Sequence, residues 1–253
     1  MSSNLFVGQH VVRLVEIDST NNYARELVRD KMPIEGTVVV TTSQTHGRGQ
    51  RSNSWVSEPG LNLTCSYILK PAFLSAVNQF ALSATVALSV YETILVFVQH
   101  QEVKIKWPND ILVGGKKIAG ILIENTLRKA NLDASIIGIG INVNQDDFEA
   151  GLNATSLKTL IKSDLDLEQV LATLSEKLEK NYLKLRCGKD AELLDSLNQS
   201  LFGRGDEIEL EINGNLELVQ IVGTAKNGEL ELRHSDGRKT SHQHHEIKWN
   251  LNP

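Results

Sequence analysis

The segment Lys106-Trp107-Pro108-Asn109-Asp110 combines a cation, an aromatic ring, a rigid turn residue and two oxygen-bearing side chains. The run before Pro108 alternates apolar residues with lysines, which predicts a strand whose cations point away from the core. Polar groups just past the end of a strand often contact a ligand at the edge of a sheet. A second polar group follows at Lys116-Lys117-Ile118-Ala119-Gly120, and Gly114-Gly115 between the two predicts a turn. We therefore expect two strands that bring the two polar groups face to face.

The glycine-rich loop 47–55 is a second candidate for binding chemistry. Gly47 and Gly49 let the backbone approach a ligand and expose its N–H groups, while Arg48 and Arg51 supply positive charge. This combination is typical of anion binding, and the alternative is a solvated turn. A Walker loop is excluded because no Gly-Lys-Ser/Thr follows, and a protein-kinase loop is excluded because its glycine spacing differs.

Two glycines also interrupt the apolar, β-branched run 136–143, which otherwise predicts a buried strand. Glycine inside a strand often marks the close approach of a ligand or of another backbone, so Gly138 and Gly140 are candidate site positions. A dinucleotide-binding fingerprint would need a third glycine where Val143 stands, and the sequence therefore excludes it.

Composition narrows the class of protein. The chain has 253 residues with 41% hydrophobic residues, which suits one medium domain and a smaller one. Its net charge of −5 argues against a general nucleic-acid binder, because such proteins need excess Lys and Arg to neutralise phosphates. The apolar stretch 81–98 is interrupted by polar residues, which predicts a buried helix rather than a membrane span. With no visible secretory signal and no metal or redox pattern at Cys65 and Cys187, we expect a cytoplasmic protein.

The remaining pattern predicts a mixed α+β domain followed by a small barrel. The periodicity predicts helices that begin at Ser19 or Thr20 and end before Pro33, that run up to Val98, and that span 167–185 and 191–201. It predicts strands at 37–42 and 61–69, the second of them half-buried. From Gly205 onward, short alternating runs are separated by Asn-Gly and Asp-Gly turns, which predicts tight hairpins and a β-barrel. We place the boundary between residues 1–203 and 204–253.

The histidines His242, His244 and His245 raise the question of a metal site. Adjacent side chains on a strand point to opposite faces, and no carboxylate or thiol stands with them in a fixed pattern. We therefore expect a solvated strand end here, with the metal site as the alternative.

Five motifs in this chain resemble, in order and spacing, those of the biotin protein ligases. They are Asp18-Ser19-Thr20-Asn21 with Gln44, the loop 47–55, Lys106–Asp110, Lys117–Gly120 and Gly138-Ile139-Gly140-Ile141-Asn142. The resemblance covers residues 17–144 strongly and implies a class II synthetase-like catalytic domain, with a mixed β-sheet backed by helices, followed by an SH3-like barrel. Seventeen residues precede Asp18, too few for a winged helix-turn-helix. We therefore expect the monofunctional type, with neither DNA nor membrane as a partner.

The resemblance also implies a chemistry. Such ligases use ATP and Mg²⁺ to convert biotin to biotinyl-5′-AMP, then transfer biotin to one lysine of a biotin carboxyl carrier protein domain. Two anions meet in the first step, so cations are needed there, and the resemblance makes Lys117 and Arg48 the catalytic candidates. The implied biotin-binding residues are Ser19, Thr20, Asn21, Gln44, Arg48, Gly49, Gln50, Lys117, Gly120 and Leu122. The implied ATP-binding residues are Arg51, Trp55, Lys106, Asn109, Asp110 and Asn142.

Several alternatives stay open at this stage. Asp110 either orients a cation or helps to hold Mg²⁺ on the ATP phosphates, and no metal cluster made by protein side chains is expected. A lipoate or octanoate ligase or transferase shares the overall fold, but its Arg-Ser-Gly-Gly-Gly type segment is absent. A non-catalytic biotin-binding protein is a third reading. Gln50 and Asn53 stand where many family members carry Arg, which bears on how firmly the loop retains the intermediate. The resemblance also allows a homodimer through sheet edges and does not identify the acceptor carboxylase.

Overall fold

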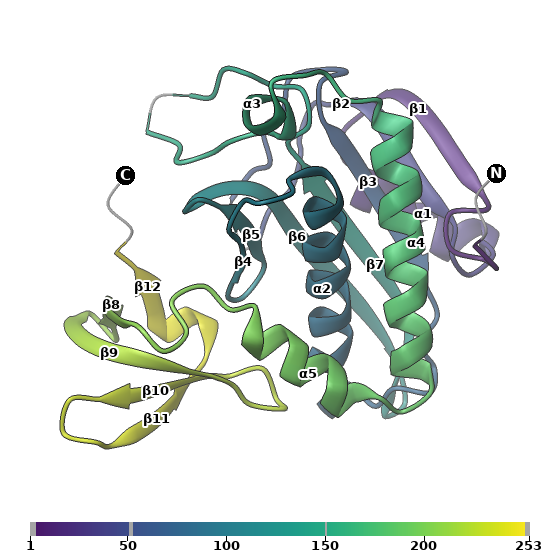
Figure 1. Ribbon diagram of the computed structural model, residues 1–253. Coiled ribbons are helices and arrows are strands. Elements are labelled where there is room, and N and C mark those ends of the chain that lie inside the picture. Colours follow the sequence, from purple (N-terminus) through teal and green to yellow (C-terminus); the bar gives the residue numbers. More distant parts are fainter. Residues whose placement is uncertain (1–3, 51–52, 150, 251–253) are drawn as a thin grey trace.

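The computed structural model describes residues 4–50, 53–149 and 151–250. Over these residues a seven-stranded sheet runs in the order β1-β2-β3-β7-β6-β5-β4 (Figure 1). Its strands are β1 (Val11–Ile17), β2 (Val38–Gln44), β3 (Leu63–Leu69), β4 (Val103–Lys106), β5 (Asp110–Val113), β6 (Lys116–Arg128) and β7 (Asn131–Ile141). Strands β1 and β2 pair in parallel, and the other neighbours pair antiparallel, so the sheet is mixed as expected.

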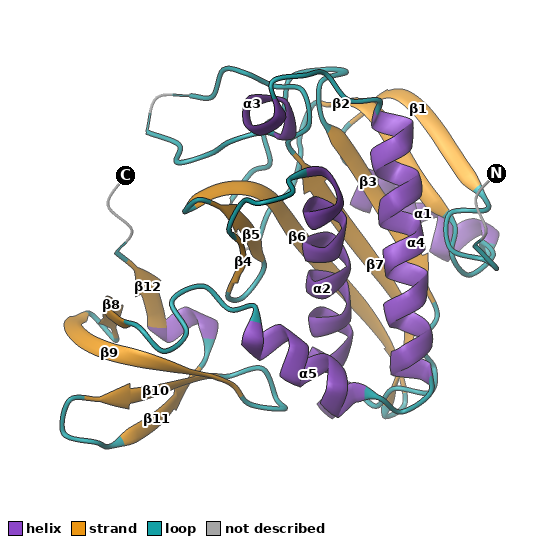
Figure 2. Ribbon diagram, in the orientation of Figure 1, coloured by secondary structure: helices purple, strands orange, loops and turns teal. Residues whose placement is uncertain are grey.

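Helices cover both faces of this sheet (Figure 2). On one face α2 (Phe80–Phe97) and α4 (Leu167–Arg186) pack against each other, and on the other face lies α1 (Thr20–Lys31). The shorter helical elements are η1 (Ala76–Asn78), α3 (Leu157–Ile161) and α5 (Asp190–Gln199). The predicted helices are therefore confirmed, with ends shifted by a residue or two.

Strand β3 differs from its prediction. All seven of its residues are buried, whereas the alternation of apolar and polar residues predicted a half-buried strand. Tyr67 and Leu69 face the core beneath α2 and α4, while Ile68 packs against α1 in a separate apolar cluster. The prediction of an exposed face was wrong because the polar residues of β3 face α1 and the site, not solvent. Ser66, for example, has no exposed surface.

Helix α2 is the apolar stretch that the sequence singled out. In the described part of the chain, one segment, Ala76–Phe97, is long and apolar enough to cross a membrane, and 56% of its most apolar window is buried in the fold. Leu82, Val86, Val90 and Ile94 have no exposed surface because they pack into the core shared with α4. The prediction of a buried helix is confirmed.

The C-terminal part forms a second, antiparallel sheet. In the described residues it has five strands in the order β11-β10-β9-β8-β12. They are β8 (Glu207–Ile212), β9 (Asn215–Thr224), β10 (Leu230–His234), β11 (Lys239–His242) and β12 (Ile247–Trp249), with η2 (His244–Glu246) before the last. Gly214, Gly228 and Gly237 all have positive φ, as the predicted tight turns require. The small β-structure expected at the C-terminal end is confirmed.

The two sheets share one core. Apolar side chains of β8–β10, such as Leu210 and Ile221, belong to the same contiguous cluster as those beneath α2. At the contact, the Trp107 indole N–H donates to the Gly228 carbonyl at 2.9 Å. A Cβ on Gly228 would lie 2.5 Å from the Phe80 ring, so the β9–β10 turn rests directly on the start of α2. The domain boundary between 203 and 204 stays a prediction, and the packing across it is extensive.

Candidate active site

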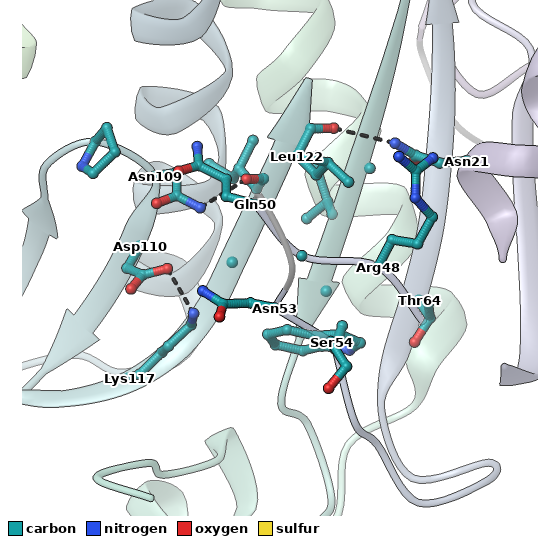
Figure 3. A pocket seen from close by; sticks show the side chains of 18 of the residues that line it. Asn21, Arg48, Gln50, Asn53, Ser54, Thr64, Asn109, Asp110, Lys117 and Leu122 are labelled. Carbon is teal, nitrogen blue, oxygen red and sulfur yellow. Dashed lines mark hydrogen bonds and ion pairs between the residues drawn. The ribbon is translucent and has the colours of Figure 1, made fainter. Parts of the chain in front are cut away.

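A cavity of about 310 Å³ opens where α1, β2, β3, β6 and β7 meet the turn between β4 and β5 (Figure 3). We call it the central cavity. Fourteen of the predicted site residues line it: Ser19, Thr20, Asn21, Gln44, Arg48, Gly49, Gln50, Trp55, Lys106, Asn109, Asp110, Lys117, Gly120 and Leu122. Arg51 lies outside the described residues. Segments that are far apart in the sequence therefore converge on one place, as the motifs predicted.

One wall of the central cavity is a neutral polar cradle at the start of α1. Ser19 has the extended backbone of an N-cap, yet its side chain makes no capping hydrogen bond. The first helical N–H, that of Thr20, instead donates to Gln44 Oε1 at 2.8 Å, and the Thr20 hydroxyl lies 3.2 Å from the same oxygen. Gln44 of β2 thus takes the place of a side-chain cap and holds Thr20 at the cavity.

Ser66 supports this cradle from below, and the sequence analysis missed it. Its hydroxyl lies 2.8 Å from Thr20 Oγ1 and 2.6 Å from Asn21 Oδ1, and the residue is fully buried. A polar side chain buried in a central strand normally satisfies a specific partner. The signal in the sequence was that Thr64 and Ser66 alternate with apolar residues along β3 and so share one face. Thr64 on that face also lines the cavity.

The opposite wall carries a charged group formed by Lys106, Asp110 and Lys117. Lys117 Nζ lies 2.6 Å from Asp110 Oδ1, and Lys106 Nζ lies 3.9 Å from Asp110 Oδ2. Burial lowers the pKa of Lys106, the Asp110 charge acts in the opposite direction, and the nearby Lys117 lowers it further. The prediction that the two polar motifs face each other is confirmed. Lys117 pairs with Leu112, just after a shift in the β5–β6 register, and its neighbour Lys116 is exposed.

Arg48 lies on the far side of the cavity from this group (Figure 3). Its guanidinium makes two contacts of 3.0 Å with the Glu124 carboxylate and a third of 3.0 Å with Asn22 Oδ1. Glu124 also accepts from Asn21 Nδ2 at 2.8 Å and pairs with Arg25. The structure thus brings Arg48 to the cavity without bringing it to Lys117. The sequence pattern did not single out Glu124, because its partners come from two distant segments, α1 and the glycine-rich loop.

Trp55 and Asn21 fill the spaces that the strand glycines Gly140 and Gly138 leave. A Cβ on Gly140 would lie 2.3 Å from the indole, and one on Gly138 would lie 2.4 Å from Asn21 Oδ1. Lys117 Nζ lies 5.7 Å from the centre of the indole ring. The sequence predicted that a ligand or another backbone would approach these glycines. In this structure the approaching groups are side chains, and the Trp55 N–H is buried with no hydrogen-bond partner among the described residues.

The two described ends of the glycine-rich loop, 47–50 and 53–55, pair antiparallel with each other. The Trp55 N–H donates to the Gly47 carbonyl at 3.0 Å, and the Gly49 N–H donates to the Asn53 carbonyl at 2.8 Å. A Cβ on Gly47 would lie 2.2 Å from the Trp55 carbonyl oxygen, so glycine is required there for this close approach. This pairing positions Trp55 over Gly120 and Gly140 of the sheet.

The two predicted asparagines of the nucleotide site are placed differently. Asn109 lines the cavity and clamps β6, since its Nδ2 donates to the Ile121 carbonyl at 2.9 Å and its carbonyl accepts from the Ile121 N–H at 3.0 Å. Asn142 lies outside the cavity lining, and its Nδ2 donates to the Thr155 carbonyl at 3.1 Å. Its predicted role at the nucleotide stays untested.

The C-terminal part contributes two further lining residues that the sequence had not assigned to this cavity. His244 and Trp249 both line the central cavity. Lys106 Nζ lies 5.6 Å from the centre of the Trp249 ring, and His244 packs edge-on against Trp107. Within the described ranges no group of three or more His, Cys, Asp or Glu side chains is arranged to hold a metal ion.

Comparison with known proteins agrees with this geometry. The sequence profile of the Biotin/lipoate A/B protein ligase family matches residues 14–142. The bifunctional ligase/repressor BirA of Bacillus spizizenii is 40% identical over 181 residues, which cover 70% of this chain and 54% of that protein. The biotin–[acetyl-CoA-carboxylase] ligase of Mycobacterium tuberculosis is 28% identical over 75% of this chain and 70% of its own length.

Among solved structures, the biotin protein ligase from Aquifex aeolicus in complex with biotin and ATP superposes with a TM-score of 0.78 at 27% identity. That match covers 95% of this chain and 98% of the other. The chain spans about half the length of the Bacillus relatives that it matches. Because the family profile covers residues 14–142, which hold nearly every residue of the charged and neutral walls, the chain belongs to the biotin/lipoate A/B protein ligase family.

Proposed function

We propose that this chain is a biotin–[acetyl-CoA-carboxylase] ligase, which activates biotin as biotinyl-5′-AMP and transfers it to a lysine of a biotin carboxyl carrier protein domain. One observation carries the proposal: a neutral hydrogen-bonding cradle and a group of cations line the same cavity of about 310 Å³. A ureido ring needs donors and acceptors without net charge. A carboxylate that attacks a phosphate needs cations where the two anions meet.

The cradle of Ser19, Thr20 and Gln44 suits the two N–H groups and the carbonyl of the ureido ring. Biotin's carboxylate would then point along β6 toward Lys117, past Gly120, where a side chain would crowd the cavity. Lys117 would balance the negative charge as a carboxylate oxygen attacks the α-phosphorus and pyrophosphate leaves. In the second step the acceptor lysine's amine attacks the acyl carbon, and AMP leaves.

Trp55 would stack on adenine, with Asn109 and Asn142 as the further nucleotide candidates and Arg51 as an additional cation. This assignment requires the Trp55 indole to exchange its present contact over Gly140 for one with the base. The unpartnered indole N–H supports that exchange, because no described hydrogen bond has to break.

Mg²⁺ would enter on the ATP phosphates. Asp110 is the carboxylate in the cavity lining, and Mg²⁺ is commonly held by one or two carboxylates together with substrate phosphates. The residues present therefore fit the ion. When bound, Mg²⁺ would offset phosphate charge, while Asp110 in its present geometry positions Lys117 at 2.6 Å.

The test is pyrophosphate release on incubation with biotin, ATP and Mg²⁺, followed by biotin transfer to a purified carrier domain. Lipoate and octanoate in place of biotin form the control arm, since both belong to the rival function. Pyrophosphate release and transfer with biotin, but not with lipoate or octanoate, support the proposal. Activity with lipoate or octanoate but not biotin, or binding of biotin with no pyrophosphate release, would overturn it.

The proposal extends to partners and location. We expect no DNA or membrane partner and a cytoplasmic location, in keeping with the net charge of −5 and the free cysteines Cys65 and Cys187. A homodimer through sheet edges stays open, and sedimentation of the purified protein would decide it. Gln50 and Asn53 are uncharged where many family members carry Arg, so we expect the loop to hold biotinyl-AMP less firmly. The rate at which biotinyl-AMP is released into solution measures this effect.

A further inference from the structure

A second cavity of about 480 Å³ adjoins the central one. It lies between the start of α2, the middle of β6 and the turns of the small sheet that carry Gly228 and His244. The turn Trp107-Pro108-Asn109 and Ile121 line both cavities, so a molecule in one touches the boundary of the other. We call this second space the amide cavity.

Its lining has a distinct chemistry. Phe80, Ala87, Ile121 and Ile123 supply apolar surface. Six carboxamides surround that surface: Gln50, Gln79, Asn109, Asn125, Asn227 and Gln243. Among the described lining residues, Glu229 and His244 are the titratable ones.

This balance excludes several occupants. Phosphate or pyrophosphate would need Lys or Arg, and the described lining has neither. A cation would need more than one carboxylate. Carboxamides both donate and accept hydrogen bonds, so they match peptide groups, and the apolar surface matches an uncharged side chain. In addition, Asn125 Oδ1 is buried and has no hydrogen-bond partner among the described residues, which calls for an N–H donor such as a peptide group.

We infer that the amide cavity binds the acceptor protein beside its target lysine: it takes an apolar side chain within two residues of that lysine and hydrogen-bonds the adjoining peptide groups. This inference rests on the proposed function. A lysine that reaches the central cavity through its four-carbon stem leaves its own backbone at the cavity mouth. Since successive residues advance by about 3.3–3.6 Å, its near neighbours fall within reach of the adjoining cavity.

The parts of the fold that form the walls also support a protein occupant. The walls come from both sheets, and Gly228 holds them together through the Trp107 contact and the Phe80 ring. A site built across this junction makes the small sheet part of acceptor recognition while leaving adenylation to the central cavity. The expected signature is a change in the KM for the carrier domain without a change in the adenylation rate.

The main test is Ser83→Arg, which fills the amide cavity from α2, with Val96→Arg as the matched control at the other, exposed end of the same helix. We expect Ser83→Arg to raise the KM for a purified carrier domain by about tenfold or more, which corresponds to about 1.4 kcal/mol. Pyrophosphate release from biotin and ATP without carrier should match wild type. Val96→Arg should match wild type in both assays.

A second variant protects the test against misfolding. Asn125→Asp changes no volume but places a negative charge among the carboxamides, and it should also raise the carrier KM selectively. Carrier domains with Asp substituted singly within two residues of the target lysine should be poor acceptors for wild type. That penalty should shrink in the Ser83→Arg enzyme, because the cavity is already blocked.

The outcomes separate the two claims. Absence of adenylation in wild type overturns the proposed function. Normal adenylation together with an unchanged carrier KM in both Ser83→Arg and Asn125→Asp overturns the inference alone. Self-association that Ser83→Arg abolishes, with carrier KM unchanged, would assign the amide cavity to a second copy of the chain and overturn the inference as well.

Discussion

The central cavity and the amide cavity share the turn Trp107-Pro108-Asn109 together with Gln50, Ile121 and His244, and they differ in the charge of the rest of their lining. The central cavity gathers Lys106, Lys117 and Arg48 and leaves two indole N–H groups, of Trp55 and Trp249, without a described partner. The amide cavity has carboxamides and apolar carbons, and its unpartnered group is an acceptor oxygen, on Asn125. The central cavity is therefore suited to anions, and the amide cavity is suited to neutral peptide groups.

The turn Trp107-Pro108-Asn109 therefore separates two surfaces that suit different ligands. Asn109 occupies the boundary and uses its own amide to hold Ile121, so it stabilises the wall between the cavities. On the charged side β6 carries Gly120, and a Cβ there would lie 3.3 Å from Lys117 Cε, so the glycine leaves room for that side chain. On the other side Ile121 and Ile123 fill that room with apolar surface.

The largest effect is expected from a substitution in the charged wall of the central cavity. Lys117→Ala should lower the adenylation rate about 100-fold or more, as removal of one donor at a developing charge typically does. Lys117 is partly exposed at a strand end, so its loss leaves little cavity and the thermal midpoint should change little. Pyrophosphate release and thermal unfolding measure the two effects.

Lys116→Ala is the matched control, because Lys116 is exposed and does not line the cavity. It should retain wild-type rates. An equal loss in both variants, or a rate for Lys117→Ala within a few-fold of wild type, would remove Lys117 from the catalytic role and with it the contrast between the two cavities.

Local motifs predicted the charged side well. Lys106–Asp110 and Lys117 lie on neighbouring strands joined by short turns, so alternation and turn residues were enough to place them face to face. The helices and the hairpins of the small sheet follow from periodicity in the same way. The contact of 2.6 Å between Lys117 and Asp110 is the outcome.

The parts that the sequence did not predict depend on contacts between distant segments. Glu124 binds Arg48 and Arg25, which lie 76 and 99 residues away along the chain. Ser66 looked like the solvated face of a strand, yet α1 covers it. His244 and Trp249 reach the central cavity only because the small sheet docks on α2 and the Trp107 turn. No local pattern encodes that docking.

A smaller effect should follow from filling the space above β7. Gly140→Ala places a methyl group 2.3 Å from the present position of the Trp55 indole, so the ring must move. Overpacking of this kind costs about 1–3 kcal/mol in the ligand-free protein, and because the proposed contact with adenine moves the indole away from Gly140, the affinity for ATP should rise by up to about 5- to 150-fold. Calorimetric titration with biotin and ATP measures it.

Gly223→Ala is the control, because its new methyl group would meet the Asn198 side chain at 3.2 Å, and neither residue lines either cavity. Trp55 lines the central cavity and does not line the amide cavity. Gly140→Ala should therefore change the affinity for the nucleotide more than it changes the KM for the carrier domain. A selective rise in carrier KM would contradict the division between the cavities.

The junction that walls the amide cavity can be tested through stability. Gly228→Ala and Gly214→Ala both place alanine at positive φ, of 90° and 86°, which costs about 1–3 kcal/mol at either site. At Gly228 the methyl group would also meet the Phe80 ring at 2.5 Å, whereas Gly214 has open space. Urea unfolding should therefore show a larger loss of unfolding free energy for Gly228→Ala. Equal losses would mean that the two sheets are not tightly packed at this turn.

The smallest effect concerns pH and the buried cation of the charged side. Burial lowers the pKa of Lys106, so its ammonium group loses its proton at a lower pH than an ordinary lysine does. If that charge supports adenylation, the rate must fall as pH rises through the lowered pKa. Lys106→Arg keeps the charge, because a guanidinium stays protonated in proteins. The alkaline limb of pyrophosphate release should therefore move to higher pH in Lys106→Arg. Lys104→Arg, on the same strand but outside the cavity lining, should leave the profile unchanged. Superimposable alkaline limbs for wild type and Lys106→Arg would show that the Lys106 charge does not act in the reaction.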